Sequence, residues 1–207
     1  MKTELRMQDF IEELKELEEN IVLRQPPKEG VVMYGSSSFR LWGAQVNEDL
    51  KRDDIANLAF GGSTLRACAF YFEQIVVPYQ PKSILLYAGD NDLGNGATAE
   101  EVFSYFQLII TKIRRHFPTI PVTFVSAKPS PSRVAMLPQI VKLNALVKAE
   151  IDVLENVFYI DVFSKMLLPN GEVDAALFIE DQLHMNAAGY KIWTETILAF
   201  KDQIFHS

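Results

Sequence analysis

The chain has one cysteine, three histidines and no long uninterrupted hydrophobic run among its 207 residues. A single cysteine, Cys68, cannot form an internal disulfide, and it leaves no cysteine cluster for zinc. No apolar stretch reaches the ~20 residues of a membrane-spanning helix. Residues 1–8 lack the apolar core of a signal peptide. We therefore expect a soluble, cytoplasmic protein without a membrane span.

The sequence also lacks an excess of positive charge. It has 20 Lys and Arg residues against 27 Asp and Glu residues, which gives a formal net charge of −7. A protein that binds nucleic acid through the phosphates needs a basic face, so we expect no nucleic-acid partner. A chain of this length can bury a core without a disulfide or metal, and it corresponds to one domain.

The first 24 residues are predicted to form an amphipathic helix that packs on a domain spanning residues 25–207. Charged side chains occupy the side of this helix opposite its apolar stripe. Two prolines at 26–27 and Gly30 then break the chain. A contact in a homodimer is the alternative interpretation of the stripe. The stripe has a spacing of three and four residues and contains Met7, Phe10, Ile11, Leu14, Leu17 and Ile21.

Apolar runs and helical stretches alternate through the rest of the chain. Near-continuous apolar strands between helices indicate a parallel sheet that is buried on both faces, and thus a single α/β sandwich. Thr98 and Glu101 match a capping box at the start of one helix. The predicted strands cover residues 31–34, 55–60, 83–88, 120–125 and 157–162. The predicted helices include Leu41 and Trp42 and cover residues 64–76, 98–117, 137–151 and 186–200.

Small polar residues follow the predicted strands, and ligands bind outside the carboxyl ends of strands in an open parallel sheet. Serines follow Gly35, a Gly-Gly-Ser-Thr segment occupies residues 61–64, and Gly-Asp-Asn-Asp occupies residues 89–92. Lys128 and Arg133 follow the fourth strand. These segments are expected to meet at one rim, where the two cations either contact an anionic or sugar-bearing substrate or have no role.

The run Ser36-Ser37-Ser38 offers a hydroxyl nucleophile at a strand-to-helix turn, although serine is also a common helix cap. Asp181 and His184 are spaced so that one loop presents both. The carboxylate would hold the imidazole in the tautomer that accepts a proton from a serine hydroxyl. A capping Asp and an incidental His are the alternative interpretation.

Acyl transfer also needs donors that stabilise the developing oxyanion. Gly62 has no side chain that would block access to its N–H, and Asn91 offers an uncharged amide. Each residue alone is typical of an ordinary turn. Their coincidence on the rim with the serines and the Asp/His pair favours an oxyanion hole.

Four segments of the chain, in order, resemble the sequence blocks of the SGNH hydrolases, also called GDSL-like esterases and lipases. The first is Gly-Ser-Ser-Ser-Phe-Arg-Leu-Trp at 35–42, the second covers 57–64, the third is Gly-Asp-Asn-Asp at 89–92, and the last is Asp-Gln-Leu-His at 181–184. Ser36 stands where the family's name motif carries Asp, and Gly-Ser-Ser-Ser is similar to the form found in a subgroup.

This resemblance implies a three-layer α/β/α sandwich of the flavodoxin type, with a five-stranded sheet of order 2-1-3-4-5, and no metal or cofactor. It places the nucleophile on Ser37, with Asp181 and His184 as its partners. It places the oxyanion donors on Ser37, Gly62 and Asn91. Substrate contacts are predicted for Ser36, Lys128 and Arg133.

The leading hypothesis is a serine hydrolase that cleaves a small-molecule carboxylic ester of a small alcohol, sugar or lipid through an acyl-enzyme. One alternative is a non-catalytic binding protein that retains the fold, because fold alone does not determine function. The other is a metal-assisted phosphoesterase, with Asp90, Asp92, Asp181 and His184 as oxygen and nitrogen ligands.

Overall fold

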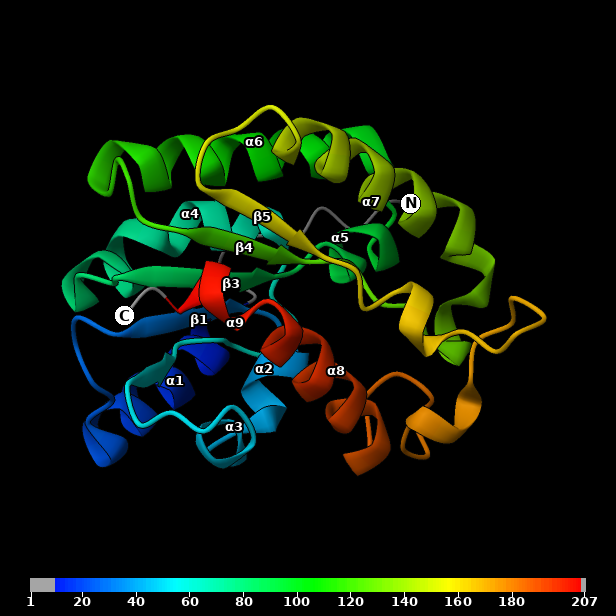
Figure 1. Cartoon of the computed structure of the whole chain (residues 1–207), viewed down its shortest axis with the longest axis horizontal. Helices are drawn as coiled ribbons and strands as arrows, with labels where there is room; N and C mark the ends of the chain where they lie inside the picture. Colours follow the sequence, from blue (N-terminus) through cyan, green and yellow to red (C-terminus); the bar gives the residue numbers. More distant parts are fainter. Residues whose placement is uncertain (1–9, 206–207) are drawn as a thin grey trace.

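The computed structural model describes residues 10–205 and contains one parallel sheet between layers of helices (Figure 1). The strand order is β2-β1-β3-β4-β5, and every neighbouring pair is parallel. The predicted α/β fold and strand order are therefore confirmed. The strands are β1 (Val31–Gly35), β2 (Ile55–Asn57), β3 (Ser83–Tyr87), β4 (Val122–Val125) and β5 (Val157–Ile160).

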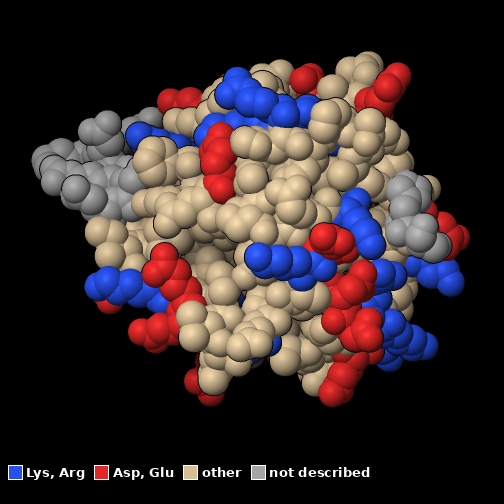
Figure 2. Space-filling view, turned by 90° about the vertical axis from the view of Figure 1, so that its left-hand side faces the viewer, with Lys and Arg blue, Asp and Glu red and all other residues tan. Residues whose placement is uncertain are grey.

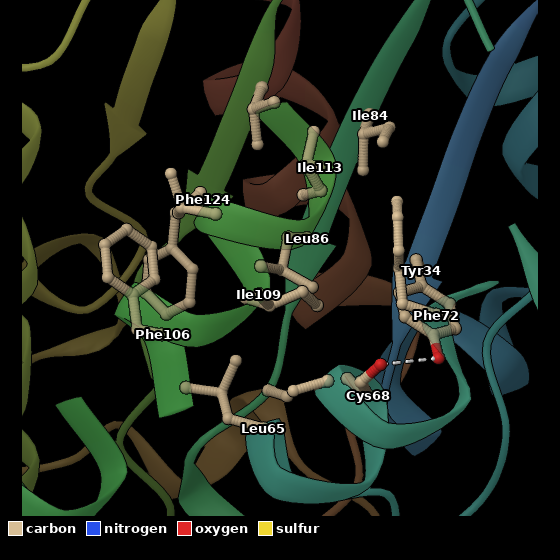
Figure 3. Packing of buried hydrophobic residues seen from close by; sticks show 14 of the residues in the cluster. Tyr34, Leu65, Cys68, Phe72, Ile84, Leu86, Phe106, Ile109, Ile113 and Phe124 are labelled. Atoms are coloured by element: carbon tan, nitrogen blue, oxygen red, sulfur yellow. Dashed lines mark hydrogen bonds between the residues drawn. The ribbon is translucent and has the colours of Figure 1, made fainter. Parts of the chain in front are cut away.

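Alternate side chains of each strand enter two separate hydrophobic clusters, because successive residues point to opposite faces of a sheet. Val32 and Tyr34 of β1 pack with α4 (Leu65–Ile75), α6 (Ala99–His116) and α7 (Leu137–Ile151) (Figure 3). Val31 and Met33 lie in the second cluster, on the other face. The helices that contribute to this second cluster are α2 (Ser37–Trp42), α3 (Gln45–Asp49), α8 (Ala187–Ala199) and α9 (Lys201–Ile204).

Side-chain caps lie at the starts of α4, α6 and α8. The Thr98 hydroxyl accepts from the Glu101 N–H, and the Glu101 carboxylate accepts from the Thr98 N–H, which is the predicted capping box. Thr64 caps α4 through the Ala67 N–H. Asn186 caps α8. Each cap satisfies N–H groups that lack partners within the first helical turn.

Some predicted elements differ from the structure. The second strand is shorter than 55–60, yet Leu58 and Phe60 still donate hydrogen bonds to the carbonyl oxygens of Met33 and Gly35. The chain thus stays beside β1 without completing the ladder. The Gly-Asp-Asn-Asp segment does not remain a loop, because Asp90–Gly94 forms the short helix α5. A further short helix, α3, was not predicted.

The N-terminal helix α1 (Ile11–Arg24) directs Leu17 into the first hydrophobic cluster, and Phe10 precedes it there. Met7 of the predicted apolar stripe lies outside the described residues. Val22 and Leu23 are exposed on α1. The homodimer contact remains a prediction.

Figure 2 shows the face at the amino ends of the strands, where basic and acidic side chains lie interspersed among uncharged ones. Between residues 10 and 205, no helix is both long and apolar enough to cross a bilayer.

Candidate active site

Ser37 is the first residue of α2 and lies at the carboxyl edge of the sheet, directly after β1. A Cβ atom at Gly35 would lie 1.8 Å from the carbonyl oxygen of Tyr87 on β3, so only glycine fits there. The Ser36 N–H donates to the same carbonyl over 2.9 Å. This turn leaves Ser37 half-buried, whereas Ser36 and Ser38 are buried.

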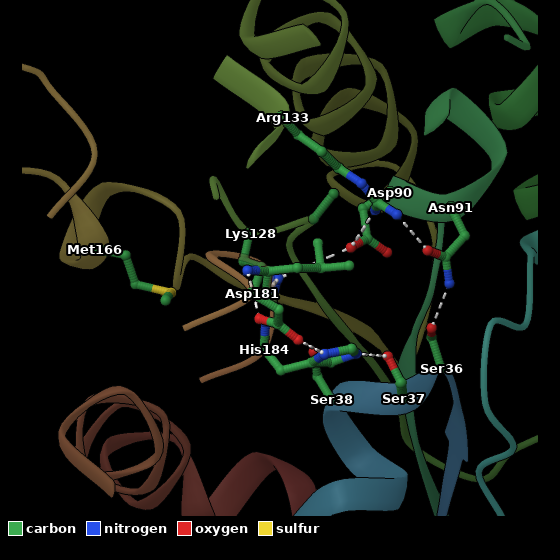
Figure 4. Close-up of polar contacts among 12 residues, drawn as sticks. Ser36, Ser37, Ser38, Asp90, Asn91, Lys128, Arg133, Met166, Asp181 and His184 are labelled. Carbon is green, nitrogen blue, oxygen red and sulfur yellow. Dashed lines mark hydrogen bonds and ion pairs between the residues drawn. The ribbon is translucent and has the colours of Figure 1, made fainter. Parts of the chain in front are cut away.

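The loop before α8 brings Asp181 and His184 to Ser37 (Figure 4). Asp181 Oδ2 lies 2.5 Å from His184 Nδ1, and His184 Nε2 lies 3.0 Å from Ser37 Oγ. Because a carboxylate only accepts hydrogen bonds, the contact assigns the ring proton to Nδ1. Nε2 is then an acceptor for the serine hydroxyl proton.

Asp181 also shapes the loop that carries the imidazole. Its Oδ1 atom accepts from the backbone N–H groups of Leu183 and His184, each over 2.9 Å. Burial raises the pKa of Asp181, but these N–H donors and the His184 ring outweigh burial and lower the pKa to about 2. The carboxylate is therefore ionised at neutral pH, as a partner of an imidazolium must be.

Gly62 lies in the turn after β2 and has a φ of +63°, in the left-handed region that favours glycine. A Cβ atom there would meet nothing within 4 Å among the described residues, so the turn faces open space. The neighbouring Gly61 N–H donates to Glu13 Oε2 of α1 over 2.7 Å. This carboxylate therefore anchors the turn from a distant part of the chain.

Asn91 lies in the first turn of α5, and its amide joins three segments of the rim. Asn91 Nδ2 donates to Ser36 Oγ over 2.7 Å and to the Ser63 carbonyl oxygen over 3.1 Å. Asn91 Oδ1 accepts from Arg133 Nη2 over 2.7 Å. The longer contact, to Ser63, is the one that a substrate oxygen would most readily share.

Lys128 is buried rather than open on the rim, with a side chain that is 1% exposed, and its predicted contact with substrate stays a prediction. Lys128 Nζ donates to the Leu183 carbonyl oxygen over 2.7 Å, beside the imidazole, and lies 4.0 Å from Asp90 Oδ2. Burial lowers the pKa of Lys128 to about 8, although Asp90 opposes this shift. Lys128 thus holds the loop that carries His184.

Ser36 and Arg133 also bind within the protein rather than facing a ligand. Ser36 is 1% exposed and accepts from the Asn91 amide. The Arg133 side chain is 14% exposed, and its Nη1 lies 2.9 Å from Asp90 Oδ2. Both residues contact Asn91, and their predicted substrate contacts stay predictions.

The acidic residues of the proposed metal site have separate partners. Asp92 accepts from the N–H groups of Leu65 and Arg66 at the start of α4, over 2.8 and 3.3 Å. Burial raises the pKa of Asp92 to about 7, although these two N–H bonds lower it. In the part of the chain that the structure describes, no three His, Cys, Asp or Glu side chains are grouped to hold a metal ion.

Two supporting residues were missed by the sequence analysis. Glu13 was assigned only to the polar side of a helix, and its contact with Gly61 spans 48 residues, so no local pattern indicates it. Asp90 was considered only as a metal ligand, whereas it pairs with Arg133. A cation can compensate the cost of burying a carboxylate. The two cations predicted on the rim, Lys128 and Arg133, were therefore the sequence signal for a partner of Asp90.

A sequence model of the GDSL-like lipase/acylhydrolase family matches residues 27–192. This range contains every residue that the sequence analysis assigned to the site. A comparison with curated protein sequences finds no match.

Solved structures share the fold at low sequence identity. A Streptococcus pneumonia protein described as a candidate platelet activating factor has a TM-score of 0.79 and 16% identity, over 93% of this chain and 94% of its own. A GDSL-like lipase from Bacteroides thetaiotaomicron has a TM-score of 0.75 and 20% identity, over 91% and 96%. A carbohydrate esterase of family 3 from Talaromyces cellulolyticus has a TM-score of 0.69 and 15% identity, over 84% and 96%.

Proposed function

Since this chain belongs to the GDSL-like lipase/acylhydrolase family and is therefore a hydrolase, we propose that it cleaves carboxylic esters through an acyl-enzyme on Ser37. The observation that carries this proposal is the line of contacts from Asp181 Oδ2 through His184 to Ser37 Oγ, at 2.5 and 3.0 Å. A hydroxyl, an imidazole and an ionised carboxylate in this order form the arrangement needed for nucleophilic acyl transfer.

In the first half of the proposed reaction, Ser37 Oγ attacks the ester carbonyl carbon while His184 Nε2 takes the hydroxyl proton. Asp181 stabilises the imidazolium through Nδ1. The carbon–oxygen bond to the alcohol then breaks, and Nε2 returns the proton to the departing alkoxide. In the second half, water attacks the acyl group with the same proton movements, and the acid leaves with Ser37 regenerated.

Three donors would stabilise the oxyanion in each half. They are the backbone N–H groups of Ser37 and Gly62 and the side-chain amide of Asn91. The open space at Gly62 supports this role, because a substrate can approach the backbone there. Asn91 adds a donor with an orientation fixed by Arg133. Loss of one such donor costs ~10²–10³ in turnover in enzymes of this type.

The charges around Ser37 favour a neutral ester. Asp90 pairs with Arg133 and lies near the buried Lys128, so both rim cations are engaged within the protein. We propose an acyl or acetyl ester of a small alcohol, sugar or lipid. Because one structural neighbour is a carbohydrate esterase, acetylated sugars belong in the substrate panel beside p-nitrophenyl esters of increasing acyl length.

The proposal is tested with Ser37→Ala in ester hydrolysis and in labelling by a fluorophosphonate. We expect the wild type to hydrolyse the ester and to carry the label on Ser37, and the variant to lose both reactions while it unfolds at the same temperature. Ser104→Ala, at an exposed position on α6, is the matched control. Full ester hydrolysis by folded Ser37→Ala would refute the assignment. An unlabelled, inactive wild type would favour the non-catalytic alternative.

Metal removal separates the ester hydrolase from a metal-assisted phosphoesterase. We expect ester hydrolysis to be unchanged after dialysis against EDTA, because every proposed step uses only protein groups. Loss of activity in EDTA, with recovery when a divalent ion is restored, would support the phosphoesterase instead.

A further inference from the structure

The amide of Asn91 can take only one orientation at its position in α5. Asn91 Oδ1 faces a guanidinium group, Arg133 Nη2, which can only donate a hydrogen bond. Asn91 Nδ2 faces the Ser63 carbonyl oxygen, which can only accept one. Rotating the amide by a half-turn would place its N–H groups against the Arg133 donor and its oxygen against the Ser63 carbonyl oxygen. The contacts therefore select the rotamer in which the two N–H bonds point toward Ser36 and Ser63.

Arg133 is itself held in place by the residue that precedes Asn91. Arg133 Nη1 lies 2.9 Å from Asp90 Oδ2, and the side chains of Arg133 and Asp90 are only 14% and 7% exposed. This contact is an ion pair between two groups shielded from water, and it is not aligned as a hydrogen bond. One planar guanidinium thus contacts two consecutive residues of α5 through two different nitrogen atoms. A lysine ammonium group has a single nitrogen and lacks this fork.

The backbone of α5 also leaves room for this contact. A Cβ atom at Gly94 would lie 3.3 Å from Arg133 Nη2 and 3.4 Å from its Cζ atom. The guanidinium therefore packs against the glycine, between the carboxylate of Asp90 and the amide of Asn91, as Figure 4 shows for the two side chains. In this position it faces protein groups rather than a ligand.

We propose that Arg133 is a positioning residue for the oxyanion donor. This inference rests on the proposed function. Arg133 does not touch the substrate. It holds Asn91 Oδ1 so that an N–H of Nδ2 is directed to the developing oxyanion when a substrate oxygen takes the place of the Ser63 carbonyl. A cation on Oδ1 also withdraws electron density from the amide, which makes its N–H groups stronger donors.

A double-mutant cycle tests this role. Asn91→Ala and Arg133→Ala are each expected to lower kcat by about tenfold or more, with KM within about threefold of the wild type. Because Arg133 acts through Asn91, the double variant should match Asn91→Ala in kcat within about twofold. Arg133→Lys retains the charge but cannot bridge both residues, so its kcat should fall between those of the wild type and Arg133→Ala. Arg115→Ala, an exposed cation on α6, is the control and should leave kcat unchanged.

Two results would overturn the inference. One is multiplicative loss, in which Arg133→Ala lowers kcat as much in the Asn91→Ala background as in the wild type. The other is a rise in KM with kcat unchanged, which assigns Arg133 to substrate binding. If Arg133→Ala fails to fold, the same cycle is run with Arg133→Lys. Ser37→Ala in the same assay distinguishes failure of the inference from failure of the proposed function, because only the latter leaves Ser37→Ala active.

Discussion

The carboxylate of Glu13 in α1 accepts a hydrogen bond from the Gly61 N–H over 2.7 Å, beside the proposed oxyanion donor Gly62. The same carboxylate oxygen lies 3.6 Å from Arg40 Nε on α2, the helix that begins at Ser37. One side chain from the N-terminal helix therefore contacts two of the three segments that are proposed to hold the oxyanion.

Replacement of Glu13 by Ala is expected to lower turnover several-fold. The Gly61 N–H loses its partner, so the turn that presents Gly62 is less firmly placed, and the unfolding free energy falls by about 1 kcal/mol. Steady-state kinetics and urea denaturation measure the two effects. Glu12→Ala is the control, because that side chain is 86% exposed and pairs with Lys15 on the surface of α1. Equal kinetics for the two variants would contradict the link between α1 and the turn.

Acidification is expected to stop ester hydrolysis by protonating the imidazole and not the carboxylate. Hydrogen bonds to Asp181 lower its pKa to about 2 even though burial opposes them, so this group stays ionised at every pH above about 3. The pH–rate profile should therefore show one acid limb. In Asp181→Asn, kcat should fall by roughly 10²–10⁴, because the imidazolium lacks its carboxylate.

Glu180→Gln, which alters the adjacent exposed acid, should keep the wild-type profile. A second acid limb in the wild type between pH 3 and 5 would show that Asp181 titrates much higher than its contacts indicate.

Asp92 is expected to make the folded chain less stable as the pH rises. A salt-bridged carboxylate has the opposite effect. Burial raises its pKa to about 7 in the folded chain, so the unfolded chain binds fewer protons between about pH 4 and 7. Stability from this group is thus present below about pH 4 and lost as the pH rises through 7. Asp92→Asn keeps an acceptor for the Leu65 and Arg66 N–H groups but removes this dependence.

Urea denaturation at pH 4.5, 6 and 8 measures the difference in unfolding free energy between the wild type and Asp92→Asn. Between pH 4.5 and 8 we expect the wild type to lose unfolding free energy relative to Asp92→Asn, by up to roughly 3 kcal/mol. Asp152→Asn, at an exposed position paired with Lys148, should show no such trend. A difference that is constant with pH would contradict the buried titration of Asp92.

A Cβ atom at Gly35 should prevent correct closure of β1 against β3. Gly35→Ala would place that atom 1.8 Å from the Tyr87 carbonyl oxygen, so the variant should lose more than about 4 kcal/mol or fail to fold. Gly96→Ala is the matched control. Its φ of +89° is equally unusual for alanine, but nothing lies within 4 Å of the new atom among the described residues, so it should lose only about 1–2 kcal/mol. Circular dichroism and thermal unfolding measure both, and equal losses would count against the clash.

The sheet order was implied by the family resemblance, whereas local chemistry predicted the elements. The Thr98 and Glu101 capping box was predicted because its bonds join residues three apart in the sequence. The strands' carboxyl ends brought Ser37, Gly62, Asn91 and the Asp/His pair to one edge. These features depend on spacing, and spacing is visible in the sequence.

The second strand and α5 show where local patterns were insufficient. Apolar residues continue through Phe60, so the pattern predicted strand to that point, but the ladder ends at Asn57. Asn57 Nδ2 donates to the Phe39 carbonyl oxygen and its Oδ1 accepts from the Ala59 N–H, which bends the chain there. The Phe39 carbonyl lies 18 residues away in the sequence, and the local sequence contains no record of that partner.

The sequence by itself determined the fold class, the helix starts and which residue types reach the rim. Only the tertiary structure decided which of those residues face a ligand and which support the others. Lys128 and Arg133 have the same charge and loop position that a substrate-binding cation would have. Both are instead buried against Leu183, Asp90 and Asn91, which is the basis of the supporting role proposed for Arg133. The physical reason is that the cost of burying a charge is met by partners distant in sequence, and folding alone brings those partners together.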